Sequence, residues 1–257
     1  MKNIRVLTLF VIMIVLGMIG SASADLNDFK HGYNLEDGTD LKGTLNLTNY
    51  NGATFTPGVV GNAANFDGVN NQFLGDLSNP VLTYEEMGGN FSYQMWVKID
   101  DVRQTWLSSY EEKTDQRRQM QVRYADDHIQ SGCYGCTQTG SSGALLDSNI
   151  SFNPGEWHHF LVIAKDGHQY LYIDGNLTAT SLLTWNLAYT VGGGSWITLG
   201  NNQGNPLEQL HGAIDSAYYW TYALDDGNCS VGETCGGEVA YLYNNGEGRE
   251  APFEDPE

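Results

Sequence analysis

The segment Phe91-Ser-Tyr-Gln-Met-Trp-Val-Lys-Ile99 carries the clearest structural signal in the chain. Large apolar side chains occupy every second position from Phe91 to Ile99. The positions between them are Ser92, Gln94, Trp96 and Lys98. Because successive side chains of a β-strand point to opposite faces, this alternation predicts a strand with one face in a hydrophobic core. Trp96 falls on the polar face, where it either packs between sheets or forms an exposed platform, and the sequence leaves both open.

Similar strand patterns recur downstream of this segment. The run from Trp157 to Ala164 is apolar on both faces apart from two histidines, which predicts a fully buried strand. The dipeptide Asp166-Gly167 then leads into the pattern from Gln169 to Ile173, and Asp-Gly between strand patterns predicts a hairpin. Further strand patterns cover residues 120–124, 196–199 and 213–222, and only residues 237–244 have helical character. Many short strands with glycine-rich turns predict an all-β fold in one domain, an antiparallel β-sandwich or jelly roll.

The composition narrows the class of protein further. The 257 residues include 31 Asp and Glu against 12 Lys and Arg, which gives a formal net charge of −19, and aromatic residues make up 12%. A disordered acidic chain would lack those aromatic residues, so a packed core is expected. The charge excludes a basic nucleic-acid binder, because the phosphate backbone would repel it. The excess of acids suits a solvated surface in a salty or cation-rich medium.

Residues 1–24 resemble a secretory signal peptide. Lys2 and Arg5 form a basic start, an almost unbroken apolar run covers residues 6–20, and Ala22-Ser-Ala24 supplies the small residues that signal peptidase requires. Cleavage is therefore expected before Asp25. The competing interpretation is an uncleaved anchor, but the apolar run is short for a bilayer span, which needs about 20 residues.

This leader predicts a secreted or cell-surface protein with no membrane insertion after cleavage. Residues 25–248 then form the sandwich domain. Residues 249–257 are charged and contain two prolines, so they are expected to form a flexible tail.

The four cysteines stand in two local pairs, Cys133 with Cys136 and Cys229 with Cys235. An even number of cysteines in an exported chain indicates disulfides, and the local pairing is the simplest of three possible connectivities. A zinc site built from all four thiolates is the rival interpretation, although the second pair has the wrong spacing for a zinc ribbon or knuckle.

Five N-glycosylation sequons also occur in the chain, and they matter in a host that glycosylates exported proteins. Their asparagines are Asn46, Asn90, Asn149, Asn176 and Asn228.

An ordered series of short phrases carries a resemblance to a known family. These phrases are Asn46-Leu-Thr-Asn-Tyr-Asn-Gly-Ala-Thr54, Pro57-Gly-Val-Val-Gly-Asn-Ala-Ala-Asn-Phe-Asp-Gly68, Phe91-Ser-Tyr-Gln-Met-Trp-Val-Lys98, Trp157-His-His-Phe160, Leu171-Tyr-Ile-Asp-Gly175, Ile197-Thr-Leu-Gly200 and Gly212-Ala-Ile-Asp-Ser-Ala217. Together they resemble the LamG-like jelly roll of the concanavalin A-like lectin/glucanase superfamily, from about His31 to Gly248. The resemblance implies a sandwich of two antiparallel sheets, often with one calcium ion, that recognises glycans or proteins.

Two regions depart from the family pattern. The segment Asp225–Gly236 is lengthened and carries the second cysteine pair, and the region around Cys133 is also elaborated. Such loops either carry partner specificity or stabilise the protein, and the sequence favours neither.

The resemblance names Asp215, in Gly212-Ala-Ile-Asp215, as the leading calcium ligand. Glu36 or Asp37 would meet it, and glycine carbonyls near residues 58–61 would complete the shell of oxygen ligands. The alternative for Asp215 is a buried carboxylate that accepts hydrogen bonds from backbone amides. Glu36 and Asp37 would serve equally well in a plain turn.

Sugar recognition usually requires aromatic rings that stack on pyranose faces beside hydrogen-bonding amides. The candidate rings are Trp106, Tyr124, Tyr134 and Trp196, with Asn201-Asn202-Gln203 nearby in sequence. His158 and His159 are adjacent in a predicted strand, so they point to opposite faces and cannot readily bind one ion.

Signatures of catalysis are mostly missing from the sequence. No strand carries the Glu-x-Asp-x-(x)-Glu cluster of the glycanases in this superfamily, and adjacent carboxylates such as Glu85-Glu86 and Glu111-Glu112 would diverge. We therefore expect a non-catalytic module that binds a polysaccharide, a glycan or a surface glycoprotein, with a structural calcium ion. The alternatives are a structural or adhesion component of a cell envelope or virion, and a divergent polysaccharide hydrolase or lyase.

Overall fold

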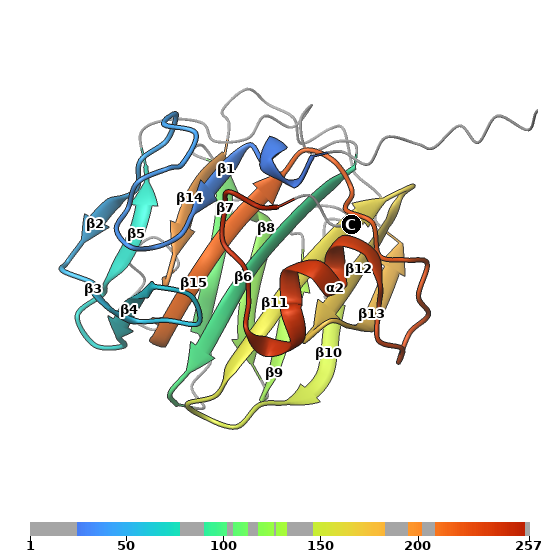
Figure 1. The fold of residues 1–257 in the computed structure, drawn as a ribbon. Coiled ribbons are helices and arrows are strands. Elements are labelled where there is room, and N and C mark those ends of the chain that lie inside the picture. The colour runs from blue at the N-terminus through green and yellow to red at the C-terminus, as the bar shows by residue number, and fades with distance from the viewer. Residues whose placement is uncertain are drawn as a thin grey trace, which may run out of the picture.

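The computed structural model describes residues 25–77, 90–101, 105–112, 118–125, 127–132, 146–182, 195–201 and 209–254. These residues form two antiparallel β-sheets that pack face to face (Figure 1). The first sheet has the order β13 (Asn176–Leu182), β12 (His168–Ile173), β11 (Trp157–Lys165), β6 (Phe91–Ile99), β15 (His211–Trp220), β4 (Asn62–Asp67) and β3 (Thr54–Pro57), and β1 (His31–Tyr33) pairs with β15.

The second sheet lies behind the first in the view of Figure 1. Its order is β10 (Leu146–Ser151), β9 (His128–Gly132), β8 (Arg118–Ala125), β7 (Thr105–Glu112), β14 (Ser195–Leu199), β5 (Phe73–Asp76) and β2 (Thr48–Tyr50). The helical elements of the described chain are short: η1 (Leu26–Asp28), α2 (Gly237–Tyr243) and η3 (Asn244–Gly246). None of them is both long and apolar enough to span a membrane.

The main core lies between the two sheets and contains the apolar face of β6. Tyr93, Met95 and Val97 are at most 2% exposed and belong to this core, as the alternation in the sequence predicts. The predicted fully buried strand is also confirmed, because β11 contributes to both sides of the sheet. Phe160 belongs to the main core, whereas Leu161 packs on the opposite face.

A second apolar cluster covers the outer face of the first sheet. It is built from η1, from α2, which lies across β11 and β12 in Figure 1, and from the segment that follows α2. The position of Trp96 is explained by this layer. The indole is 1% exposed, and its ring centroid lies 5.1 Å from that of His159 and 5.9 Å from that of Tyr243 in α2. Trp96 is therefore a packing residue, although it packs beneath a helix and not between the sheets.

The predicted flexible tail is wrong for residues 249–254. Ala251 and Phe253 are buried, and the Phe253 ring packs against Tyr218 with centroids 5.0 Å apart. Asn27 and Phe253 exchange two hydrogen bonds of 2.8 Å, so this segment is fastened to the start of the described chain. Charge and prolines indicated disorder, but two apolar side chains find partners that are distant in sequence.

The second cysteine pair forms the predicted local disulfide, Cys229–Cys235. Two disulfide-bonded thiols cannot supply a four-thiolate zinc site, so the zinc alternative is wrong for this pair. Cys133 and Cys136 lie outside the described residues. The loop closed by the disulfide lies along the first residues of β13: the N–H of Leu177 donates to the carbonyl of Glu233, and the N–H of Gly232 donates to the carbonyl of Leu177.

Candidate functional site

Side-chain amides gather at the end of the sandwich where β4 leads into β5, on the left of Figure 1. They come from β2 and the turn after it, the loop between β4 and β5, and the residues on either side of the segment 202–208. We call them the amide cluster, and its members are Asn49, Asn51, Asn70, Asn71, Gln72, Asn201 and Gln209.

Asn71 is the residue that links the three segments. Its backbone N–H donates to the side-chain oxygen of Gln209, and its carbonyl accepts from Asn51 Nδ2 at 2.7 Å. Its side-chain oxygen accepts from Asn201 Nδ2, also at 2.7 Å. The backbone of Asn71 is left-handed, with φ 58°, a conformation that asparagine tolerates better than most residues.

Asp67 and Gln72 hold the loop that carries these amides. Asp67 Oδ1 accepts the N–H groups of Val69 and Asn70 at 2.9 Å, and Oδ2 accepts Asn70 Nδ2 at 2.6 Å. Burial acts to raise the pKa of Asp67, but these donors outweigh it and the pKa is lowered. Gln72 accepts from the N–H of Asp67 and donates to the carbonyl of Gly52, which ties the loop to the turn after β2. The cluster is thus a fixed arrangement of polar groups.

Asn201 holds a buried polar atom that has no partner among the described residues. The residue is 0% exposed, and its Nδ2 is used by Asn71, but its Oδ1 has no hydrogen bond. A buried acceptor left unsatisfied costs about 1–3 kcal/mol, so this oxygen suits a buried water molecule. The preceding Gly200 has φ +89°, and a Cβ there would collide with the Phe66 ring, so the backbone that positions Asn201 requires glycine.

Aromatic and charged groups complete this end of the molecule. The half-buried Tyr50 ring stacks on Phe73 with centroids 4.3 Å apart, and Val69 is 72% exposed at the tip of the loop. The charged groups nearby are Asp67 and the pair His211–Asp101, whose Nδ1 and Oδ2 lie 3.4 Å apart. Residues 49–54, 67–73, 199–201 and 209–212 include no Lys or Arg. Because amides both donate and accept, the site suits an uncharged ligand rich in hydroxyl groups.

Of the residues predicted to bind sugar, those that the structure describes are Tyr124 and Asn201. Tyr124 is 1% exposed inside the main core, so its ring cannot stack on a sugar, which its place in the alternating pattern of β8 already indicated. Trp106 and Trp196 lie in β7 and β14, and their side chains are outside the described part, as is all of Tyr134. Within Asn201-Asn202-Gln203, the described residue Asn201 does belong to the amide cluster. The signal that sequence reasoning missed is the concentration of Asn and Gln at residues 49–51 and 70–72.

The residues predicted to bind calcium are engaged by N–H donors. Asp215 is 0% exposed, and its Oδ2 accepts the N–H groups of Val59 at 2.7 Å and Val60 at 3.2 Å. Glu36 accepts both the backbone and side-chain N–H groups of Asn62, and Asp37 accepts the N–H of Thr39. The described residues include no group of three or more His, Cys, Asp or Glu side chains arranged to hold a metal ion.

The hydrogen bonds of Glu36 and Asp37 match the alternative interpretation of carboxylates that serve in turns. The hydrogen bonds of Asp215 match the alternative interpretation of a carboxylate that fixes the turn at residues 58–61 through backbone amides. Calcium binding by this protein, with Asp215, Glu36 and Asp37 as its candidate ligands, stays a prediction.

Two carboxyl groups with raised pKa values lie where the C-terminal segment meets β15, Asp215 in the strand and Glu250 in the segment. Burial raises the pKa of Asp215 to about 6, against the effect of the N–H groups of Val60 and Val59. Burial and the neighbouring Asp215 raise the pKa of Glu250 to about 8, and the Ser216 hydroxyl donates to both carboxylates at 3.3 Å. Raised pKa values are typical of glycosidase acids, but Asp215 is closed to solvent and faces a turn of its own chain.

The adjacent histidines point to opposite faces, as the sequence predicts. His158 Nδ1 lies 2.8 Å from Asp174 Oδ2, and its ring packs on Phe152 at the main core. His159 is 0% exposed on the outer face, where its Nε2 lies 2.7 Å from Gln94 Oε1. Both are structural residues, and they share no ion site among the described residues.

Two antiparallel sheets packed face to face, with a short helix on the outer face, define a β-sandwich of the jelly-roll class. Within that class the chain belongs to the concanavalin A-like lectin/glucanases superfamily, because the family model of that description matches residues 75–228, more than half of the chain. This confirms the family resemblance in the sequence. A comparison with curated proteins finds no match.

Solved structures share the fold at low sequence identity. The binding domain of Paraclostridial Mosquitocidal Protein 1 matches with a TM-score of 0.62 and 14% identity, over 85% of this chain and 52% of that one. A Trypanosoma rangeli sialidase mutant that displays trans-sialidase activity matches with a TM-score of 0.58 and 14% identity, over 77% of this chain and 31% of that one. Domain 4 of AbnA, a GH43 extracellular arabinanase from Geobacillus stearothermophilus, was solved with arabinotriose. It matches with a TM-score of 0.51 and 16% identity, over 77% of this chain and 94% of that one.

These comparisons show the fold alone. The chain spans about half the length of the first of these proteins and about a third of the second.

Proposed function

We propose that this protein is a non-catalytic glycan-binding module of the extracellular space, and that the amide cluster is its sugar contact. The observation that carries the proposal is a fixed group of side-chain amides, of which Asn51 and Asn70 are exposed. These exposed amides would contact sugar hydroxyls.

The comparisons support this function at the level of the fold. A domain of similar fold was solved with arabinotriose, and another is described as a binding domain. The Cys229–Cys235 disulfide supports an oxidising, extracellular setting.

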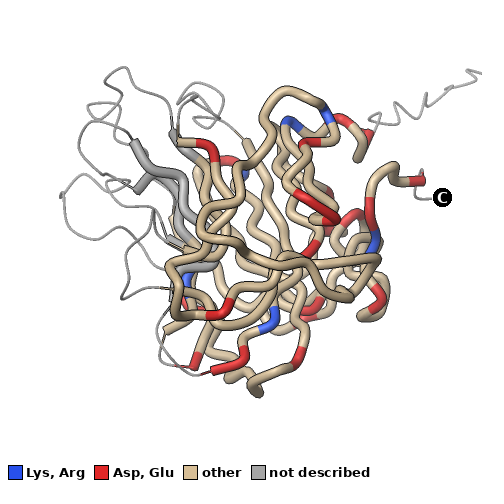
Figure 2. Tube along the Cα trace, turned by 90° about the vertical axis from the view of Figure 1, so that its left-hand side faces the viewer, with Lys and Arg blue, Asp and Glu red and all other residues tan. Residues whose placement is uncertain are grey.

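Charge supports an uncharged glycan as the ligand. Figure 2 shows Asp and Glu distributed over the described chain, with few Lys and Arg. With a formal net charge of −19, the protein repels anionic sugars such as uronic or sialic acids, and no Lys or Arg stands among the cluster residues to hold a carboxylate. Neutral polysaccharides and their oligosaccharides are therefore the proposed class of ligand.

The absence of catalysis is part of the proposal. Glycoside hydrolysis requires two carboxyl groups that face each other across the scissile bond. Of the two carboxyl groups with raised pKa values, Asp215 is fully buried, and it lies against the turn at residues 58–61 and not at the amide cluster.

A polysaccharide and glycan array tests the proposal directly. The purified chain is expected to bind one class of neutral glycan and to leave the bound glycan intact. Binding to no glycan would contradict the proposal and favour the structural or adhesion role. Release of shortened products would instead establish a hydrolase or lyase.

A pair of variants connects any binding to the amide cluster. Asn51→Gly removes an exposed amide of the cluster at a left-handed position, φ 60°, which glycine adopts without strain. Asn149→Gly is the matched control, because Asn149 is also exposed and left-handed, with φ 51°, but lies in β10 at the opposite edge of the second sheet. Only Asn51→Gly is expected to weaken the array signal.

A further inference from the structure

The strand β13 lacks the features that keep the edge of a β-sheet from pairing with another chain. An edge strand presents N–H and C=O groups without a neighbour, and proteins protect it with charged side chains, proline, a bulge or a very short strand. β13 ends the first sheet, on the right of Figure 1. Its seven residues, Asn176-Leu-Thr-Ala-Thr-Ser-Leu182, include no charged residue and no proline.

The other strands at the ends of the two sheets are protected. β2 has three residues, and β3 has four and ends at Pro57, which has no N–H to donate. β10 contains a register irregularity between Asp147 and Ser151, with left-handed backbone at Asn149. Among these end strands of the described sheets, β13 is the exception.

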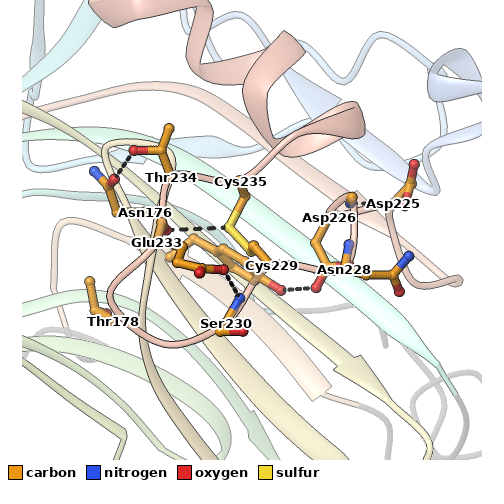
Figure 3. The surroundings of a disulfide bond; sticks show 12 residues. Asn176, Thr178, Asp225, Asp226, Asn228, Cys229, Ser230, Glu233, Thr234 and Cys235 are labelled. Atoms are coloured by element: carbon orange, nitrogen blue, oxygen red, sulfur yellow. Dashed lines mark hydrogen bonds between the residues drawn. A yellow bond between two sulfur atoms is a disulfide. The ribbon is translucent and has the colours of Figure 1, made fainter.

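The loop closed by the disulfide, residues 229–235, covers only the start of this edge. It forms two backbone hydrogen bonds with Leu177 and a β-bridge between Thr234 and Asn176. Figure 3 shows Thr234 in contact with Asn176. Because Leu177 uses both its N–H and its carbonyl in this contact, a further strand can pair with β13 only beyond Leu177.

We call residues 178–182 the open edge of β13. Within the described chain they pair with β12 alone, and the irregularity in that pairing falls at Thr178. Residues 179–182 therefore form a regular strand. Thr180 is exposed and Leu182 is 65% exposed, so the outer side of this stretch is accessible to a partner.

We propose that two copies of this chain pair antiparallel through the open edge of β13, with Thr180 of one copy opposite Thr180 of the other. An edge strand that meets its own copy about a two-fold axis offers the same N–H and C=O groups in return, so the contact is self-complementary. The loop at residues 229–235 sets the register, because Thr180 is the middle residue of the open edge. Thr178 then lies opposite Leu182, and Ala179 opposite Ser181.

Charge favours a second copy at this edge over a second copy elsewhere. Each chain has a formal net charge of −19, so two copies repel each other over much of their surface. Neither β13 nor the adjacent β12 contains Asp, Glu, Lys or Arg. The residues that meet at the axis are threonines, and threonine pairs stabilise antiparallel strands.

Sedimentation velocity of the full chain over a series of concentrations tests the proposal. The chain is expected to pass from monomer to dimer as its concentration rises. Added sodium chloride should strengthen the dimer, because it screens the repulsion between two acidic chains. A monomer at every concentration, or a dimer that salt weakens, would overturn the proposal. The outcome does not depend on the proposed glycan binding.

Charged variants at Thr180 locate the contact. Thr180→Lys and Thr180→Glu each place like charges opposite one another, so each variant alone should dimerise about tenfold more weakly than the wild type. An equimolar mixture of the two should recover the dimer, since Lys then lies opposite Glu and the total charge equals that of two wild-type chains.

Thr54→Lys is the matched control. Thr54 is an exposed threonine in β3, at the other end of the same sheet, and its variant has the same net charge as Thr180→Lys. This control is expected to dimerise at least as strongly as the wild type. Equal dimerisation by Thr180→Lys and Thr54→Lys would overturn the proposal, as would a mixture of the two Thr180 variants that stays monomeric.

Discussion

Asp40 shows how a single buried carboxylate organises a loop that has little regular structure. It is 1% exposed and accepts backbone N–H groups from Gly32, Lys42, Thr44 and Leu45 at 3.0–3.2 Å, with His31 Nδ1 at 3.2 Å. Burial acts to raise the pKa of Asp40, but His31 and the N–H donors lower it well below its ordinary value. The ionised form therefore holds residues 38–45 in place.

Asp40→Asn is expected to reduce the free energy of unfolding by about 3 kcal/mol, because an amide cannot accept all of these donors and leaves buried N–H groups unpaired. Urea denaturation measures the loss. Asp37→Asn is the control, since Asp37 is exposed in the same turn region and its loss should cost less than about 1 kcal/mol. Equal costs for the two variants would contradict the role given to Asp40.

His159 links stability to pH through its burial on the outer face. Burial lowers the pKa of His159 to about 4, against a smaller opposing effect of Asp174. In the unfolded chain the imidazole takes up its proton near pH 6.5. The contribution of the neutral ring to the free energy of unfolding is therefore complete above pH 6.5, and it is lost as the pH falls toward 4.

Acidification from pH 7 to pH 5 is expected to cost the wild type about 2 kcal/mol more than it costs His159→Gln, since each unit of pKa difference corresponds to about 1.4 kcal/mol. The Asp215 and Glu250 carboxyls have raised pKa values, so they stabilise the folded chain further as the pH falls through the same range. Because both chains contain these groups, their contributions cancel when the wild type is compared with His159→Gln. Urea midpoints at the two pH values supply the measurement. Parallel pH profiles would show that His159 does not titrate as its burial requires.

At the scale of elements, strands were predictable and their covering layer was not. The residues Phe91–Ile99 are those of β6, because a period of two over nine residues is a local signal. The helix α2 at Gly237–Tyr243 also agrees with the sequence. The layer over Trp96 forms because η1, α2 and residues 249–254 pack on one face of the sheet. A local sequence pattern cannot predict contacts between segments that are distant in sequence.

The amide cluster was missed for the same reason. Asn51, Asn71 and Asn201 each stand in an ordinary turn or strand end, and their sequence neighbours do not show that they converge. Asp215 was correctly recognised as a special residue, but only the fold shows that amides of the turn at 58–61 surround its carboxylate.

Phe253→Ala tests the packed C-terminal segment. Phe253 is 6% exposed and its ring lies against Tyr218, Phe29 and Trp220, so its removal is expected to cost about 3–4 kcal/mol of unfolding free energy. Leu41→Ala is the control, because Leu41 is 45% exposed and its loss should cost less than about 1 kcal/mol. A phenylalanine in a flexible tail would give no loss at all.

At the scale of the whole molecule, the sandwich buries a core on both faces of its first sheet, and a structural calcium ion would add to the stability that this packing gives. An ion bound only by the folded state would raise the melting temperature by mass action. The calcium ion predicted from the family is therefore expected to give a lower melting temperature in EDTA than in calcium. Equal melting temperatures in calcium and in EDTA would contradict the bound ion.

Titration of one neutral oligosaccharide, chosen from the array, into wild type, Asn51→Gly and Asn149→Gly tests the central claim most directly. We expect Asn149→Gly to match the wild type and Asn51→Gly to bind about five- to tenfold more weakly, the effect of one or two lost neutral hydrogen bonds. An unchanged Kd for Asn51→Gly, or equal weakening by both variants, would contradict the assignment of sugar binding to the amide cluster.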